Sequence, residues 1–166
     1  MKVILYSAIS IDGFIAKTDG DSDWVSREDI PFFMEEIKKA GCIVVGSKTY
    51  KQFSPDLYPV KDVFNIVLTK AAAQKFAGAT TATSPEAAIK LAAEQGFTSM
   101  LIAGGGNVNG AFYDAGLVDE IILDIHPLAI GSGIKVFENT SKFSDYEFVA
   151  SQNLPGGLIL ARYKKK

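Results

Sequence analysis

Short runs of apolar residues alternate along this chain with segments in which apolar positions recur at helical spacing. Residues 3–9 are almost continuously apolar, which is typical of a strand buried on both faces of a sheet. Helices are predicted over residues 31–40, 85–95 and 107–115, with another beginning at residue 47. The same reasoning predicts further strands at residues 42–46, 63–69, 80–83, 100–103, 120–125, 146–154 and 158–163.

The order of these elements predicts the fold class. Strands alternate with helices through most of the length, which indicates a largely parallel sheet with helices on both faces. Pro155, Gly156 and Gly157 separate the last two strands and predict an antiparallel hairpin. The expected fold is α/β, three layers in the order α/β/α, with a mostly parallel central sheet and an antiparallel C-terminal hairpin. At 166 residues, the chain is expected to form a single domain, residues 1–166.

The first predicted helix has clear boundary signals. Ser26 and Asp29 have the spacing of a capping box. Pro31 fits the first helical turn, and Gly41 ends the helix. A negative charge at the start of a helix complements the helix dipole, so position alone favours a capping role for Asp29.

A run of three glycines, Gly104, Gly105 and Gly106, joins a buried strand to the start of a predicted helix. This arrangement places bare backbone N–H groups at a helix N-terminus, where the dipole favours an anion. The glycines also remove every Cβ atom from the turn, so that a flat ligand can lie directly on the backbone. Two glycines would satisfy a tight connection, which favours a ligand surface here. Residues 46–50 also turn from strand into helix and give a second potential anion site.

The glycine run also suggests a Rossmann dinucleotide-binding unit. Asp124 follows Gly104 by twenty residues, at the end of the next strand, where a ribose-binding acid is expected. Two observations argue against this interpretation. Asn109 stands at the third glycine of the Gly-x-Gly-x-x-Gly pattern, and only a hairpin follows the unit, which leaves no room for a classical nucleotide-binding half.

Composition and charge narrow the candidate functions. The net charge of −2 gives no sign of a nucleic-acid surface, and no apolar run approaches the length of a membrane span. Neither nucleic acid nor membrane is therefore expected as a partner. Cys42 lies in an apolar run and is interpreted as a core residue in a reducing compartment, which predicts a cytoplasmic protein. One histidine and one cysteine cannot form a zinc site, so no metal is expected.

Short motifs are spaced along almost the whole chain. They lie at residues 10–16 (Ser-x-Asp-Gly-x-Ile-Ala), 23–26 (Asp-Trp-Val-Ser), 45–50 (Val-Gly-x-x-Thr-Tyr), 67–70 (Val-Leu-Thr-Lys), 104–106 (Gly-Gly-Gly), 116–120 (Gly-Leu-Val-Asp-Glu) and 127–133 (Pro-x-x-x-Gly-x-Gly). In this order and spacing they resemble the dihydrofolate reductase-like superfamily. The nearer resemblance is to the C-terminal reductase domain of bifunctional riboflavin-biosynthesis deaminase/reductases and its stand-alone bacterial relatives.

The resemblance implies NADPH as the cofactor, held by two turns across the carboxyl ends of the strands. Family members often have a cis peptide bond at the position of Gly104–Gly105. Lys48 and Lys70 are suited to the 2′-phosphate of NADPH, although Ser47 stands where the family usually has arginine. The implied cofactor-binding residues are Ala8, Ile15, Gly46, Ser47, Lys48, Thr49, Leu68, Thr69, Lys70, Gly104, Gly105, Gly106, Asn107 and Val108.

The resemblance also implies a substrate side. In dihydrofolate reductase proper, a carboxylate follows the active-site tryptophan by five residues, and an aromatic residue follows four later. Asp29 and Phe33 meet these spacings after Trp24, and Asp124 occupies the position of the family's substrate-side threonine. Asp29 and Asp124 are the candidate catalytic residues, expected to face one pocket and to share a proton. Trp24 and Phe33 are the candidate substrate-binding residues.

The implied function is NADPH-dependent hydride transfer to a small molecule of the pterin, pyrimidine or ribosylaminopyrimidine type, as in a 5-amino-6-(5-phosphoribosylamino)uracil reductase. True dihydrofolate reductase is an alternative, but the arginine that binds the folate glutamate tail has no counterpart, and only Lys61 is near. A module that binds a nucleotide without catalysis is an alternative of another class. The riboflavin-type relatives are commonly dimers, so the same resemblance predicts a homodimer.

Overall fold

The computed structural model describes residues 1–71 and 73–166. No helix in these residues is long and apolar enough to cross a membrane. The strands are β1 (Lys2–Ser10), β2 (Phe14–Ala16), β3 (Cys42–Gly46), β4 (Phe64–Leu68), β5 (Thr80–Ala82), β6 (Ser99–Ile102), β7 (Glu120–His126), β8 (Ile134–Lys135), β9 (Tyr146–Leu154) and β10 (Leu158–Lys165). The helices are α1 (Ile30–Ala40), α2 (Ser47–Gln52), α3 (Pro85–Glu94) and α4 (Gly106–Asp114), with 3₁₀ turns η1 (Arg27–Asp29) and η2 (Pro155–Gly157).

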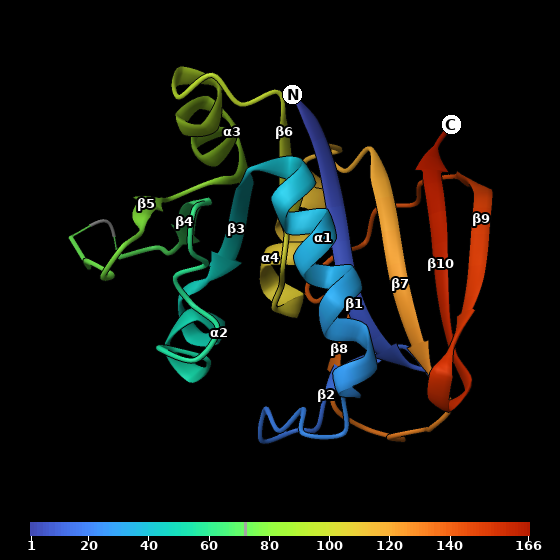
Figure 1. The fold of residues 1–166 in the computed structure, drawn as a ribbon. Coiled ribbons are helices and arrows are strands. Elements are labelled where there is room, and N and C mark those ends of the chain that lie inside the picture. The colour runs from blue at the N-terminus through green and yellow to red at the C-terminus, as the bar shows by residue number, and fades with distance from the viewer. Residues whose placement is uncertain (72) are drawn as a thin grey trace.

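Eight strands form the central sheet, in the order β5-β4-β3-β6-β1-β7-β10-β9 (Figure 1). All pairs from β5 to β7 are parallel, whereas β10 runs antiparallel to both β7 and β9. The predicted mostly parallel sheet with an antiparallel C-terminal hairpin is therefore confirmed. All of β3 is buried, because a central parallel strand is covered on both faces.

Helices cover the two faces of the sheet and divide the core into two apolar layers. Ile37 of α1 and Tyr50 of α2 lie in one layer, against residues of β3, β4 and β6. Ala88 of α3 and Phe112 of α4 lie in the other layer. Figure 1 accordingly shows α1 in front of the sheet and α4 behind it. The α/β/α order of layers matches the prediction.

The start of α1 differs from the predicted capping box. The hydroxyl of Ser26 accepts a hydrogen bond from the N–H of Glu28 at 3.2 Å and so caps η1, which precedes α1. Asp29 is the N-cap residue of α1, but its side chain makes no capping bond. The capping-box prediction was wrong because the carboxylate of Asp29 turns toward the sheet instead. Gly41 does end the helix, in the left-handed conformation at φ 69°.

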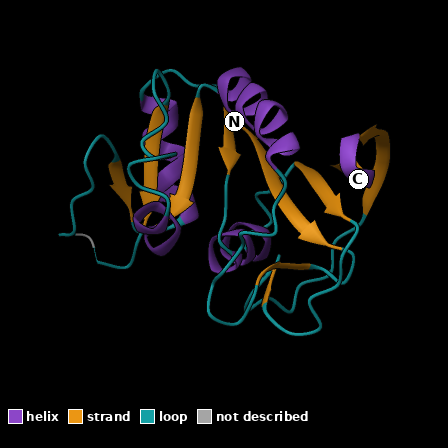
Figure 2. Ribbon diagram, turned by 60° about the horizontal axis from the view of Figure 1, so that its bottom comes forward, coloured by secondary structure: helices purple, strands orange, loops and turns teal. Residues whose placement is uncertain are grey.

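A small second sheet, absent from the prediction, lies beyond the carboxyl ends of the parallel strands. Strand β2 pairs antiparallel with β8, although the two are far apart in the sequence. The carboxylate of Asp12 accepts hydrogen bonds from the backbone N–H groups of Ile130 and Gly131 and reinforces this link. Figure 2, in which the bottom of Figure 1 comes forward, looks toward this side of the molecule.

Candidate active site

The carboxyl ends of the parallel strands lie along one edge of the sheet, and most of the sequence motifs gather there. Neighbouring strands β1 and β6 lead into helices on opposite faces of the sheet, α1 and α4 respectively. In open α/β sheets, ligands bind outside the carboxyl ends of the strands at a point of divergence of this kind.

The two glycine turns predicted to bind the cofactor, at residues 46–50 and 104–106, are direct neighbours. The N–H of Gly46 donates to the carbonyl oxygen of Gly104 at 2.8 Å. A Cβ atom on Gly46 would lie 3.0 Å from Cγ2 of Val108, and one on Gly105 would lie 3.2 Å from Oγ1 of Thr49. The two turns therefore pack too closely for larger residues. The Gly104–Gly105 peptide bond is cis, which confirms that prediction.

The third glycine of the run has a packing role in the fold. A Cβ atom on Gly106 would lie 2.4 Å from the carbonyl oxygen of Lys135. One on Gly110, a turn further along α4, would lie 1.9 Å from the carbonyl oxygen of Glu138. These two glycines are needed because residues 134–138 pass directly over α4. The missing side chain of Gly106 makes room for the chain itself, and contact of Gly106 with a cofactor stays a prediction.

The N-termini of α2 and α4 fit an extended anionic cofactor. Neither helix is capped by a side chain, whereas Ser84 caps α3. Lys48 in the first turn of α2 and Lys70 shortly after β4 are exposed, and neither forms an ion pair within the residues that the structure describes. Free N–H groups and unpaired lysines are the donors that a dinucleotide phosphate requires.

The remaining predicted cofactor residues lie around these two turns. Ala8 lies on β1 in register with Asp124, and Ile15 lies in β2. Ser47, Thr49, Leu68 and Gly105 are half-buried, Thr69 and Val108 are buried, and Asn107 is exposed at the start of α4. The structure thus brings these segments to one edge of the sheet, and their contact with a cofactor stays a prediction.

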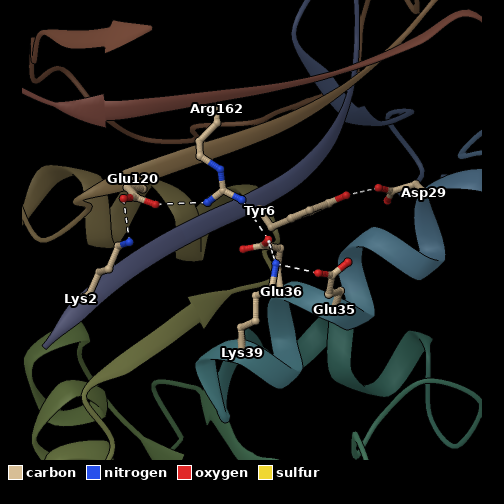
Figure 3. A network of polar contacts seen from close by, with 8 residues as sticks. All are labelled: Lys2, Tyr6, Asp29, Glu35, Glu36, Lys39, Glu120 and Arg162. Atoms are coloured by element: carbon tan, nitrogen blue, oxygen red, sulfur yellow. Dashed lines mark hydrogen bonds and ion pairs between the residues drawn. The ribbon is translucent and has the colours of Figure 1, made fainter. Parts of the chain in front are cut away.

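Asp29 is the last residue of η1, and its side chain points at the sheet, where it meets Tyr6 of β1. The phenol of Tyr6 donates a hydrogen bond to Oδ1 of Asp29 (Figure 3). Both residues are buried, with 3% of Tyr6 and 6% of Asp29 exposed. This contact explains why the carboxylate does not cap α1: it accepts from a phenol instead of from a backbone N–H.

Asp124 is the second buried carboxylate, on β7 beside β1. The residue is fully buried, and neither of its carboxylate oxygens has an aligned hydrogen-bond partner among the described residues. Nδ1 of His126 is the nearest polar group, 3.2 Å from Oδ2 of Asp124 and 3.3 Å from its backbone oxygen. A buried carboxyl group without a partner is costly, which marks this position as a candidate functional site.

The surroundings of these groups raise their pKa values. Burial raises the pKa of Asp29, and the hydrogen bond from Tyr6 opposes that rise. Burial, and after it the charge of Asp29, raises the pKa of Asp124 to about 7. Burial, together with Asp29, also raises the pKa of Tyr6, so the phenol keeps its proton. Asp124 is therefore the carboxyl group of the pair that can hold a proton near neutral pH.

Two aromatic residues predicted for the substrate side pack onto this cluster from different segments. The ring of Trp24 meets that of His126 edge to face, with centroids 5.2 Å apart. The ring of Phe33 lies 5.1 Å from that of Tyr6. The indole Nε1 of Trp24 is buried and has no hydrogen-bond partner in the described chain. The structure therefore brings together Trp24, Asp29, Phe33 and Asp124, while their contact with a substrate stays a prediction.

Tyr6 and His126 belong to this cluster, although no sequence motif singles them out. Tyr6 lies inside an apolar run that predicts only a buried strand, and a single histidine with a single cysteine predicts no metal site. A signal for His126 was present. Residues two apart on a strand face the same side, so Asp124 and His126 had to be neighbours once β7 was placed. Across the described residues, no group of three or more His, Cys, Asp or Glu side chains is placed to hold a metal ion.

Comparison with known proteins agrees with this arrangement. Residues 1–160 match the RibD C-terminal domain family. The chain is 30% identical over 145 residues to the uncharacterised protein YwjB of Bacillus subtilis, covering 82% of each chain. A fold of this kind, with its glycine turns and its buried cluster at the carboxyl ends of the strands, places the protein among the dihydrofolate reductase-like α/β proteins. Within that class, the chain belongs to the RibD C-terminal domain family.

Solved structures share the fold at low sequence identity. A putative riboflavin biosynthesis protein from Shewanella sp. PV-4 superposes with a TM-score of 0.84 at 22% identity, covering 100% of this chain and 99% of that one. A deaminase/5-amino-6-(5-phosphoribosylamino)uracil reductase from Thermotoga maritima gives a TM-score of 0.81 at 20% identity. That match covers 99% of this chain and 56% of the Thermotoga protein, so this chain spans about half of that longer one.

Proposed function

We propose that this protein is an NADPH-dependent reductase of a flat heterocyclic small molecule, of the pterin, pyrimidine or ribosylaminopyrimidine type. The observation that carries the proposal is the buried pair of carboxyl groups, Asp29 and Asp124, beside two uncapped helix N-termini. Asp124 lies on β7, two strand positions from β6, whose end leads into the glycine turn. The distance between β7 and β6 across the sheet is therefore about 10 Å. Membership of the RibD C-terminal domain family supports reduction of a pyrimidine-type substrate.

The residues around the two glycine turns would hold the cofactor. The N–H groups at the start of α2 and α4 would bind the pyrophosphate, and Lys48 and Lys70 would bind the 2′-phosphate. NADPH, when bound, supplies the hydride, and the protein supplies orientation and electrostatics. Charge at Lys48 and Lys70 is the reason to propose NADPH over NADH.

Asp124 would hold the proton that accompanies the hydride. Reduction of a C=N or C=O group adds a hydride to carbon and a proton to nitrogen or oxygen. A carboxyl group whose pKa is about 7 is matched to proton transfer near neutral pH. Asp29 stays the more acidic partner, held by Tyr6, and its charge raises the pKa of Asp124. Trp24 and Phe33 would stack on the flat ring.

A substrate panel tests this proposal. NADPH oxidation is measured with dihydrofolate, a dihydropterin and 5-amino-6-(5-phosphoribosylamino)uracil as separate substrates. Turnover with the phosphoribosylamino compound supports the riboflavin-type activity, and turnover with dihydrofolate alone indicates the alternative, true dihydrofolate reductase. Asp29→Asn should lower kcat on the accepted substrate by about 10²-fold, with the Kd for NADPH changed less than about twofold. Glu28→Gln, at the neighbouring exposed carboxylate, is the matched control and should keep normal kcat.

Cofactor binding is tested separately from turnover. A ligand that binds only the folded state raises the melting temperature, so NADPH should raise it more than NADH does. Lys48→Ala combined with Lys70→Ala should remove that difference. NADPH binding without oxidation in the presence of any panel substrate would indicate the nucleotide-binding module instead, and no shift with either cofactor would reject both functions.

We also propose that residues 1–166 act as one domain, as a homodimer in the cytoplasm. Burial raises the pKa of the Cys42 thiol to about 12, which keeps this cysteine unreactive, as expected of a core residue. The exposed sheet edge at β9 is the surface proposed for the dimer.

A further inference from the structure

His126 makes specific contacts on both sides of its ring. Its Nε2 atom accepts a hydrogen bond from the backbone N–H of Ser26 at 3.0 Å. An Nε2 atom that accepts carries no proton, so the ring is neutral and its proton lies on Nδ1. Nδ1 faces Asp124, 3.2 Å from Oδ2. The ring therefore stands between the segment that contains Ser26 and the carboxyl group of Asp124.

The Nδ1–H group of His126 is a donor within reach of the buried carboxyl group of Asp124, 3.2 Å from Oδ2. The N–H is shared between Oδ2 and the backbone oxygen of Asp124, which explains why neither carboxylate oxygen has a well-aligned bond. Rotation about the broad terminal torsion of the carboxyl group would align it. The other titratable groups that face Asp124 are Asp29 from η1 and Tyr6 from β1, and neither stabilises its ionised form.

The Nε2 side of the His126 ring, opposite the side that faces Asp124, contacts the segment that contains Trp24. Trp24 packs edge to face on His126, and Ser26 donates to it, so two residues of one segment are fixed by a single side chain. His126 is 2% exposed, which keeps water from replacing these contacts. The segment and the carboxyl group thus share one rigid partner.

We propose that His126 is a positioning residue with two separate roles: it places Trp24 over the proposed substrate site, and it stabilises the ionised carboxylate of Asp124. Nε2 holds the segment through the Ser26 N–H, and Nδ1 stabilises the ionised carboxylate. This inference rests on the proposed reductase function for its kinetic consequence, but its structural consequence can be measured without turnover.

Two substitutions separate the two sides of the ring. In His126→Asn, the side-chain N–H₂ can take the place of Nδ1–H, but the acceptor for Ser26 is lost. In His126→Gln, the side-chain oxygen can take the place of Nε2, but the donor to Asp124 is lost. Far-UV circular dichroism and a thermal unfolding midpoint establish that each variant is folded.

The first measurement uses the protein without substrate. Titration of the Asp124 carboxyl carbon by ¹³C NMR, assigned with Asp124→Asn, should show a pKa at least about half a unit higher in His126→Gln than in wild type. His126→Asn should leave that value unchanged. Amide exchange at Ser26 should accelerate about tenfold or more in His126→Asn and stay near the wild-type rate in His126→Gln.

The second measurement is kinetic. His126→Gln should move the alkaline limb of the kcat profile to higher pH with KM unchanged, because protonated Asp124 persists to higher pH. His126→Asn should raise KM severalfold and leave the pH profile in place. Ser26→Pro, which removes the N–H at a residue whose φ of −67° suits proline, should reproduce the His126→Asn result, and Ser26→Ala is its control.

The outcomes are distinguishable from failure of the proposed function. The NMR and exchange differences without any turnover would support both roles of His126 and reject the reductase assignment. If both variants shift both readouts alike, or if neither shifts either one, His126 only fills space and the inference is overturned.

Discussion

Asp124 combines complete burial with a carboxyl group that lacks an aligned partner, and this gives a clear dependence of stability on pH. Its pKa, about 7 in the folded chain, lies above the unfolded value near 4. Below about pH 4 the protonated carboxyl group makes its full contribution to the free energy of unfolding. That contribution is lost as the pH rises from about 4 through about 7. Between the two values the loss is about 1.4 kcal/mol per pH unit.

Asp124→Asn should remove this dependence, because its amide does not ionise. The variant should have a larger free energy of unfolding than wild type at about pH 8, and the advantage should shrink toward about pH 4. Urea denaturation across this range measures the difference. Asp56→Asn in an exposed loop is the control, expected to stay within about 0.5 kcal/mol of wild type throughout. Parallel stability curves for Asp124→Asn and wild type would mean that folding does not raise the pKa of Asp124.

The candidate site could be predicted from the sequence only in part. Trp24, Asp29 and Phe33 follow one another at fixed spacing, so a resemblance could locate them. Tyr6 and His126 could not be located in that way. Tyr6 meets Asp29 across 23 residues and Ser26 meets His126 across 100, and such contacts depend on how η1 settles against the sheet. No local pattern encodes that placement.

Helix α1 is tied to the sheet by a polar network that lies away from the acidic pair (Figure 3). Arg162 of β10 lies 2.9 Å from Oε1 of Glu36 on α1 and 3.3 Å from Oε2 of Glu120 on β7. Glu36 is only 9% exposed, and Lys39 is its other cationic partner. Loss of Arg162 would leave a mostly buried carboxylate short of one partner.

Arg162→Gln should therefore lower the free energy of unfolding by about 1–3 kcal/mol, since it leaves a buried charge partly unpaired. Glu36→Gln in the same chain should recover part of that loss, giving a coupling energy of about 1 kcal/mol or more in a double-mutant cycle. The exposed pair Lys90–Glu94, at 3.8 Å, is the control and should couple by less than about 0.5 kcal/mol. Equal coupling at both pairs would contradict a special role for this network.

Helix α4 depends on its glycines for packing, not for flexibility. Alanine favours a helix over glycine by about 1 kcal/mol, so propensity alone predicts that Gly110→Ala stabilises the chain. The Cβ atom would lie 1.9 Å from the carbonyl oxygen of Glu138, so the steric cost should prevail. We expect a net loss of about 1–3 kcal/mol in denaturant unfolding. Ala111→Gly measures propensity in the same helix, and a stabilised Gly110→Ala would refute the close packing of residues 134–138.

At the scale of the whole molecule, periodicity was enough to predict the parallel sheet and its hairpin. Long apolar runs and helical spacing are local signals, and they decide which segments become strands and helices. The β2–β8 sheet escaped prediction because its strands are only three and two residues long. This sheet is stabilised by the pairing of β2 with β8 and by Asp12, which accepts a hydrogen bond from a backbone N–H 119 residues away.

The two edges of the large sheet differ in how they are protected. At one edge β5 is only three residues long, and short edge strands resist further pairing. At the other edge β9 has nine residues, is exposed from Glu147 to Asn153, and contains no lysine, arginine or proline. Phe148 and Val149 on it are 61% and 51% exposed. A long exposed edge strand without lysine, arginine or proline is a site for pairing with another strand.

A second copy of β9 fits this edge. Antiparallel pairing about a two-fold axis at Ala150 would set Phe148 opposite Gln152 and Glu147 opposite Asn153, so no like charges would meet. Light scattering after size exclusion should then give twice 17.8 kDa at micromolar concentration. Val149→Lys should yield the monomer, because a charged edge strand disfavours pairing. Ile11→Lys, at an apolar residue 66% exposed elsewhere, should remain a dimer. A monomeric wild type, or a Val149→Lys protein that stays dimeric, would exclude this edge as the interface.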